Sequence, residues 1–198
     1  MPGPAAGKRF GRAVEDLSLH ILDIAENALR ADATTIEIIL SRDVAADLLT
    51  LEIKDDGRGM DRETLTRVRD PFFTTKGKKT GLGIPFLTQA AEQTGGRVTI
   101  ESAPEKGTQV MAEFHWGHID RPALGDVGGT VVTLLAGHPD VRVVYEERQG
   151  ERFSRLDTQE LKKDLEGVPI NEPAVLDAIR ETIKKEFILT NEGRIHEQ

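Results

Sequence analysis

The sequence Asp23-Ile-Ala-Glu-Asn27-Ala-Leu-Arg30 places a carboxylate and an amide within an otherwise apolar helical pattern. Apolar residues recur around it at the spacing of an amphipathic helix: Leu17, Ile21, Ile24, Ala25 and Ala28. Asp23 and Asn27 are four residues apart, so they lie on adjacent turns of one face. Oxygens at that spacing can hold a metal-bound phosphate and a water molecule between them. Taken alone, however, the segment is better explained as a solvated helix whose Asn27 caps a buried turn.

A second polar segment, Asp55-Asp56-Gly57-Arg58-Gly59, follows a strand expected over residues 49–54. Apolar and polar residues alternate in that strand, which is typical of a half-buried position. A carboxylate at its end can accept a hydrogen bond from an exocyclic amine, and the glycines let a flat base approach the backbone. We therefore expect Asp55 to contact a base. An ordinary turn is the alternative, because aspartate and glycine favour turns for conformational reasons.

A third segment, Thr80-Gly81-Leu82-Gly83, precedes a helix expected over residues 84–94. Pro85 suits the first helical turn, and Gly95-Gly96 suits the end. The unpaired amide groups at the start of this helix favour an anion. Three lysines just upstream add positive charge: Lys76, Lys78 and Lys79. The alternative is a flexible basic loop.

The fourth segment, Lys106-Gly107-Thr108, lies between two strands expected over residues 97–102 and 109–114. It is either a simple hairpin turn or a phosphate contact made by the hydroxyl or amide of Thr108.

In order and spacing, the four segments resemble the Bergerat-fold (GHKL) ATP-binding domain. This domain is shared by sensor histidine kinases, type II topoisomerases, mismatch-repair ATPases and a heat-shock chaperone. The resemblance covers residues 17–114 and includes an aromatic box at Phe72-Phe73. It implies an α/β fold, an α+β sandwich in which helices cover one face of a mixed β-sheet.

The resemblance also implies a role for each matching position. Asn27 would bind Mg²⁺, Arg30 and Lys76 would contact phosphate, and Asp55 would recognise adenine. Asp23 falls where the ATPase members have their catalytic general base. Further contacts to ATP are implied for Gly57, Gly59, Phe73, Thr75, Thr80, Gly81, Leu82, Gly83 and Thr108.

The chain combines features of two branches of this superfamily. Residues 71–76 and 80–84 are similar to histidine kinases, whereas residues 26–34 are similar to mismatch-repair proteins. Seven residues separate Phe73 from Gly81, so we expect a short, lysine-rich lid. Histidine kinases also carry a phosphoacceptor histidine on a helical hairpin before the ATP-binding domain. Only sixteen residues precede Leu17, so we expect a small standalone member without that hairpin.

The remaining sequence predicts a flexible tail over residues 1–14, the ATP-binding domain over 15–117 and a small α+β module over 118–198. The elements expected in this module are a helix over 122–137, a hairpin of strands 141–145 and 151–156, and helices over 157–165 and 172–189. Asp157 and Glu160 have the spacing of a capping box at the start of the helix expected over residues 157–165. Nothing in this module has a catalytic pattern.

Composition narrows the class of protein. The chain has a net charge of −8, no cysteine and no apolar run long enough to cross a bilayer. These features favour a cytoplasmic protein that does not bind a membrane. The excess of acidic residues also argues against nucleic acid as a binding partner. His115 and His118 alone are a weak metal site, so we expect no metal besides magnesium.

Two functions are compatible with these observations. The chain is either a kinase of histidine-kinase type that transfers the γ-phosphoryl group to a separate partner protein in signal transduction, or an ATP-gated interaction module. The second class includes slow hydrolysis in which Asp23 acts on water. Anti-sigma serine kinases of the same superfamily make the first class reasonable without an internal histidine.

Overall fold

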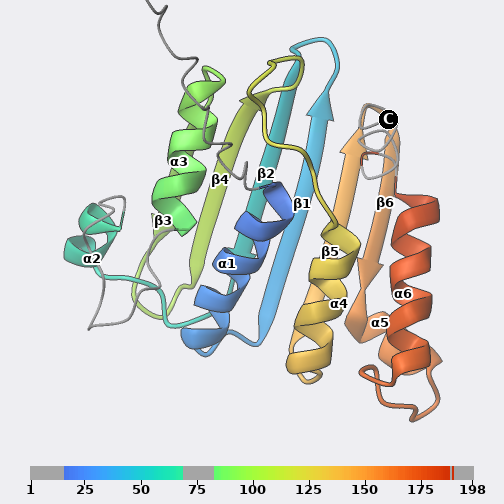
Figure 1. Ribbon diagram of the computed structural model, residues 1–198. Coiled ribbons are helices and arrows are strands. Elements are labelled where there is room, and N and C mark those ends of the chain that lie inside the picture. Colours follow the sequence, from blue (N-terminus) through green and yellow to red (C-terminus); the bar gives the residue numbers. More distant parts are fainter. Residues whose placement is uncertain (1–15, 69–82, 188, 190–198) are drawn as a thin grey trace, which may run out of the picture.

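A computed structural model describes residues 16–68, 83–187 and 189. Six strands form one sheet in the order β3-β4-β2-β1-β5-β6, and helices α1, α3, α4 and α6 cover one of its faces (Figure 1). The expected mixed sheet with helices on one face is thus confirmed. In chain order the elements are α1 (Leu17–Arg30), β1 (Thr35–Asp43), β2 (Leu48–Asp55), α2 (Arg62–Arg67), α3 (Gly83–Gln93), β3 (Arg97–Ser102), β4 (Thr108–His115), α4 (Val127–Gly137), β5 (Arg142–Gln149), β6 (Arg152–Asp157), α5 (Thr158–Asp164) and α6 (Pro173–Glu186).

The strand β1 occupies the middle of the sheet but is not among the predicted elements. Its apolar residues Ile36, Ile38 and Leu40 occupy every second position and are fully buried. This alternation could have predicted the strand from the sequence. β1 pairs antiparallel with β2 and parallel with β5. The other three strand pairs are antiparallel.

The C-terminal part extends the sheet of the N-terminal part, since β5 lies directly beside β1. Tyr145 of β5 pairs with Ile38 in register and is fully buried with it in one continuous hydrophobic core. The predicted helices and hairpin of this part are confirmed with shifted bounds. For example, α4 begins at Val127 because Asp126 caps it and accepts a hydrogen bond from the Gly129 amide (2.9 Å).

One predicted detail of the C-terminal part is wrong. Asp157 does cap α5 and accepts from the Gln159 amide at 3.0 Å. Glu160, however, accepts a hydrogen bond from Arg155 at 3.1 Å, and this pairing takes the place of the expected capping box. The arginine on the neighbouring strand β6 offers the carboxylate a charged donor, which is a stronger partner than a backbone amide.

The segment that leads into α4 also holds the start of α1. The amide groups of Leu17 and Ser18 donate to the carbonyl oxygens of Ala123 and Leu124 at 2.9 and 3.1 Å. These bonds satisfy donors that a helix start leaves open. The C-terminal part therefore fixes the position of the helix that carries Asp23 and Asn27. Across the described residues, none of the helices has the length and apolarity needed to span a membrane.

Candidate nucleotide-binding site

The polar face of α1 is arranged as the helical spacing predicts. Asp23 is exposed, and Asn27 one turn later is half-buried. The Asn27 side-chain oxygen accepts a hydrogen bond from Arg30 at 2.9 Å, while the other terminal nitrogen of Arg30 pairs with Glu26 at 2.5 Å. This chain of contacts holds the amide oxygen and a positive charge side by side on one helical turn. Such a pair suits a metal-bound phosphate.

Gly83, the first residue of α3, lies against Asp23. A Cβ atom on Gly83 would come within 2.9 Å of the Asp23 Cβ and 3.1 Å of a carboxylate oxygen. Any larger residue would force the two helices apart. The glycine at this position therefore lets the start of α3 reach the polar face of α1, and two segments about sixty residues apart become neighbours.

Asp55 ends β2 and faces Thr108 across the β2–β4 ladder. Its carboxylate is half-buried and accepts a hydrogen bond from the Gly57 amide at 2.9 Å. Burial raises the pKa of Asp55; the amide groups of Gly57 and Thr108 oppose this rise, and the neighbouring charge of Asp56 adds to it. Asp55 is therefore a partly desolvated acceptor beside Thr108, which brings the second and fourth sequence segments together.

The adjacent carboxylate, Asp56, has a structural task that sequence reasoning missed. It accepts three hydrogen bonds: from the Thr34 amide (2.7 Å), the Thr34 hydroxyl (2.6 Å) and the Thr35 amide (2.8 Å). Partial burial alone would raise its pKa, but these bonds outweigh burial and lower it. Asp56 thus joins the end of β2 to the start of β1. An Asp-Asp pair does not reveal which carboxylate is free for a ligand.

The glycines of the second segment are required by packing. A Cβ atom on Gly57 would lie 2.8 Å from the carbonyl oxygen of Ala31, just after α1. Gly59 has a φ of 65°, and a Cβ there would overlap the Ala103 carbonyl. Both glycines therefore let the segment after β2 lie close to the end of α1 and to the β3–β4 turn.

Arg58 is a second residue that the motif does not single out. Its guanidinium donates to the carbonyl oxygen of Arg30 at 2.7 Å, and its backbone amide donates to Ala31 at 2.9 Å. A basic side chain at a helix C-terminus satisfies open carbonyl groups and complements the helix dipole. Arg58 therefore holds the Asp55–Gly59 segment against α1.

Ser102, the partner of Thr108 in the β3–β4 ladder, holds Thr108 in place. The Ser102 oxygen lies 3.1 Å from the Thr108 hydroxyl, 2.8 Å from the Gly107 carbonyl and 2.8 Å from the Met60 amide. One hydroxyl thus connects the segment after β2 with the turn before β4. Ser102 is absent from the sequence-based candidates, because its role depends on the pairing of two strands.

Several predicted site residues lie outside the described residues: Phe73, Thr75, Lys76, Thr80, Gly81 and Leu82. The expected lid between Phe73 and Gly81 also falls there. The described site therefore consists of the α1 face, the end of β2, the start of α3 and the β3–β4 turn. No three histidine, cysteine or carboxylate side chains gather as a metal site within the described ranges.

A depression of about 390 Å³ lies at the same end of the sheet. Its lining comes from β2, β3, β4 and the β3–β4 turn, and includes Lys54, Glu101 and Gln109. These side chains alternate with buried neighbours such as Ile53, Ile100 and Val110, so they point to the face that the helices leave open. This depression is therefore separate from the α1 face, although Asp55 and Thr108 contribute to the lining of both.

Two curated relatives are similar to just under half of this chain. Sporulation kinase A of Bacillus subtilis (strain 168) is 35% identical over 95 residues, which are 47% of this chain and 15% of that protein. Sensor protein kinase PilS of Pseudomonas aeruginosa is 33% identical over 96 residues, which are 46% of this chain and 18% of that protein. The chain therefore spans less than a fifth of the length of either relative.

The fold itself has a solved counterpart. The crystal structure of the N terminal domain of a DNA repair protein aligns with a TM-score of 0.53 and 13% identity, covering 87% of this chain and 56% of that chain. A family model described as histidine kinase-, DNA gyrase B-, and HSP90-like ATPase matches residues 13–118, which is more than half of the sequence. The chain therefore belongs to this ATPase family.

Proposed function

We propose that the chain binds Mg-ATP at the α1 face and transfers the γ-phosphoryl group to a separate partner protein in signal transduction. The observation that carries the proposal is the convergence of four distant segments. A Cβ atom on Gly83 would lie 2.9 Å from the Asp23 Cβ, and Asp55 pairs with Thr108. Arg58 connects the two pairs, since it donates to the carbonyl oxygen of Arg30. Two relatives named as kinases match 47% and 46% of this chain, which favours phosphoryl transfer over simple binding.

The residues present fit a magnesium ion. Mg²⁺ prefers oxygen ligands and keeps several waters, so the Asn27 amide oxygen together with phosphate oxygens would suffice. When bound, the ion would neutralise charge on the triphosphate. Arg30, which now holds that amide oxygen at 2.9 Å, would add a second positive charge next to the phosphates.

The positions of three histidines support an acceptor on another protein. His20 is buried with 2% of its surface exposed. His115 pairs with Leu48, seven ladder positions away from the Asp55–Thr108 pair, which corresponds to roughly 24 Å along the strand. His118 follows His115 and lies at the same end of the sheet. The burial of His20 and the distance of His115 and His118 from the Asp55–Thr108 pair therefore favour an acceptor on another protein.

Asp23 is the candidate for acting on the nucleophile. It is exposed on α1 and adjacent to the start of α3, where the open amide groups of a helix favour an anion. A carboxylate there can orient or deprotonate an attacking group. If that group is water, the chain is a slow ATPase whose nucleotide state changes the surface it offers to a partner.

The test is incubation of the purified chain with γ-labelled ATP and magnesium, with separate measurement of label in free phosphate, in the chain and in co-purified proteins. Label on a second protein is expected. Free phosphate alone would replace the kinase proposal with an ATPase, and retained ATP without product would leave a nucleotide-gated interaction module. No ATP binding at all would refute both.

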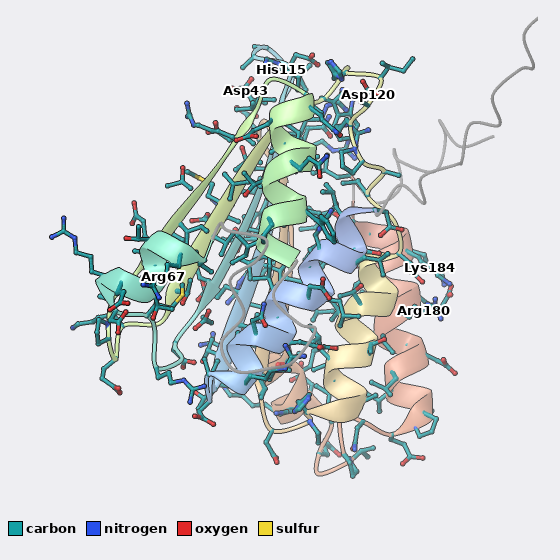
Figure 2. The ribbon with its side chains drawn as sticks, turned by 60° about the vertical axis from the view of Figure 1, so that its left-hand side comes forward. Asp43, Arg67, His115, Asp120, Arg180 and Lys184 are labelled. Carbon is teal, nitrogen blue, oxygen red and sulfur yellow. The ribbon has the colours of Figure 1, made fainter. Side chains whose placement is uncertain are left out.

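A pair of variants sharpens this assay. Asp23→Asn should keep ATP affinity but slow label release at least ten-fold, because one charged catalytic group is lost. Asp120→Asn is the matched control: Figure 2 shows Asp120 at the same end of the molecule as Asp43 and His115, away from the site. Equal rates for parent and Asp23→Asn would remove Asp23 from the chemistry.

A further inference from the structure

Three neighbours surround the hydroxyl group of Ser102, at the end of β3. The Met60 amide donates to it at 2.8 Å. The Gly107 carbonyl oxygen lies 2.8 Å away, and the Thr108 hydroxyl lies 3.1 Å away. An amide can only donate and a carbonyl can only accept, whereas the threonine hydroxyl can do either.

Only one assignment of hydrogen atoms satisfies all three contacts. A serine hydroxyl has one hydrogen and two lone pairs. The hydrogen must point to the Gly107 carbonyl, since otherwise two acceptors would face each other at 2.8 Å. The Met60 amide uses one lone pair. The second lone pair is then left to accept the hydrogen of the Thr108 hydroxyl.

This assignment fixes what Thr108 can offer to a ligand. Its only hydroxyl hydrogen points to Ser102, so the oxygen presents lone pairs elsewhere. The carboxylate of Asp55 lies on the same face beside Thr108, with which Asp55 pairs in register. An ionised carboxylate also only accepts. This corner of the site therefore presents two hydrogen-bond acceptors and favours a ligand group that has two donors.

We propose that Ser102, by orienting the Thr108 hydroxyl, makes the site select a purine with an exocyclic 6-amino group over a 6-oxo purine. An amino group brings two N–H donors to the two acceptors, either directly or through water. A 6-oxo group would bring a further acceptor to the same place. Ser102 is thus a positioning residue, since it acts on the base through Thr108. This inference rests on the proposed nucleotide site.

The test compares affinities for Mg-ATP and Mg-inosine triphosphate, which differ at position 6 of the base. Calorimetric titration of the parent should give a clear preference for ATP. In Ser102→Ala the Thr108 hydroxyl is released and can donate to a 6-oxo group. We therefore expect the ratio of the two affinities to fall roughly ten-fold, in keeping with the effect of one buried hydrogen bond to a ligand.

Two further variants separate positioning from a general loss of structure. Ser102→Thr keeps a hydroxyl at the same place and should retain the parental ratio. Thr99→Ala lies on the same strand, at a position that alternates with buried Ile100 and therefore faces away from the site; it should leave the ratio unchanged. Circular dichroism of each variant shows whether the fold is kept.

A double variant tests the route through Thr108. Thr108→Val should lower the ratio by itself, and adding Ser102→Ala should then change it no further. An unchanged ratio in folded Ser102→Ala, or a further fall in the double variant, would overturn the inference while leaving nucleotide binding intact. A parent that binds neither nucleotide would instead overturn the proposed function, and this inference with it.

Discussion

Two carboxylates on the helix-covered side of the sheet have opposite environments. Glu147 in β5 is fully buried and accepts hydrogen bonds from the Tyr145 hydroxyl and from the Leu189 amide (2.7 Å). Tyr145 in turn stacks on Phe187 with ring centroids 4.8 Å apart. Asp55 in β2 is only half-buried, and it accepts a hydrogen bond from the Gly57 amide at 2.9 Å. The chain itself surrounds Glu147, whereas Asp55 keeps acceptor capacity for a ligand.

Asp157 and Asp55 also differ in environment, and this difference shifts their pKa values in opposite directions. Arg142 donates to Asp157 at 2.6 Å and Arg155 does so at 2.8 Å, and these contacts lower the pKa of Asp157 to about 2. Among the described residues, no guanidinium has this role at Asp55, where burial raises the pKa. Glu147 and Asp157 therefore accept hydrogen bonds from groups of the fold itself, while the half-buried carboxylate of Asp55 keeps capacity to accept a further hydrogen bond.

The largest effect is expected at Glu147. Glu147→Ala removes the acceptor to which the Tyr145 hydroxyl and the Leu189 amide donate, and should lower the free energy of unfolding by about 3 kcal/mol. ATP affinity should not change. Urea unfolding and nucleotide titration measure the two quantities. Glu151→Ala, in the exposed turn between β5 and β6, is the control. A loss equal to that of the control would mean that Glu147 does not hold the C-terminal segment.

The second effect is expected at Asp55. Asp55→Asn replaces a charged acceptor and should weaken ATP binding by roughly 1.5–3 kcal/mol, about 10- to 100-fold in Kd. The free energy of unfolding should stay close to that of the parent. Asp43→Asn, at the β1–β2 turn at the other end of the sheet, serves as the control. If ATP keeps both its affinity and its preference over GTP in Asp55→Asn, the adenine assignment is wrong.

The third effect is the pH dependence of the contribution that Asp157 makes to the free energy of unfolding. Its folded pKa of about 2 lies below the ordinary value of 3.8. The ionised carboxylate therefore stabilises the fold above about pH 4, and this contribution of about 2 kcal/mol is lost as the pH falls from 3.8 through 2. The difference in unfolding free energy between the parent and Asp157→Asn should shrink over that window. A difference that does not vary with pH would contradict the role of the arginines.

The smallest effect is expected at Asn27. Asn27→Ala removes the proposed protein ligand of magnesium, so the gain in ATP affinity on adding Mg²⁺ should disappear. We expect this gain to be about ten-fold, or ~1.4 kcal/mol, in the parent. Affinity measured in EDTA should be the same for both proteins. A magnesium-dependent gain that survives in Asn27→Ala would place the metal elsewhere.

Local patterns were enough to predict most of the secondary structure and the placement of some candidate site residues on it. The helical period around Asp23 and Asn27 predicted α1, and alternation predicted β2, β3 and β4. These signals are readable because a helix or a half-buried strand repeats its environment every few residues. By the same logic β1 could have been predicted from Ile36, Ile38 and Leu40. The parallel pairing of β1 with β5 could not, because no local pattern encodes which distant strand is the neighbour.

Local patterns also could not predict which residue has which role in the candidate site. Asp55 and Asp56 are the same residue type, so the sequence does not distinguish them. In the structure Asp55 faces Thr108, whereas Asp56 accepts hydrogen bonds from Thr34 and Thr35. Strand register decides this, since successive side chains point to opposite faces. Ser102 and Arg58 acquire their roles only when β3 meets β4 and when the segment after β2 meets α1.

The sequence by itself determined the elements of this protein and the kinds of groups in its candidate site: an aspartate and an asparagine one helical turn apart, a carboxylate at a strand end, and glycines where two segments must pass closely. Only the tertiary structure decided which of those groups meet and which hydrogen bonds remain for a ligand. The reason is physical. Helix and strand periods arise from neighbours along the chain, whereas pairing register and hydrogen-bond direction arise from residues far apart in sequence that close packing brings within 3 Å.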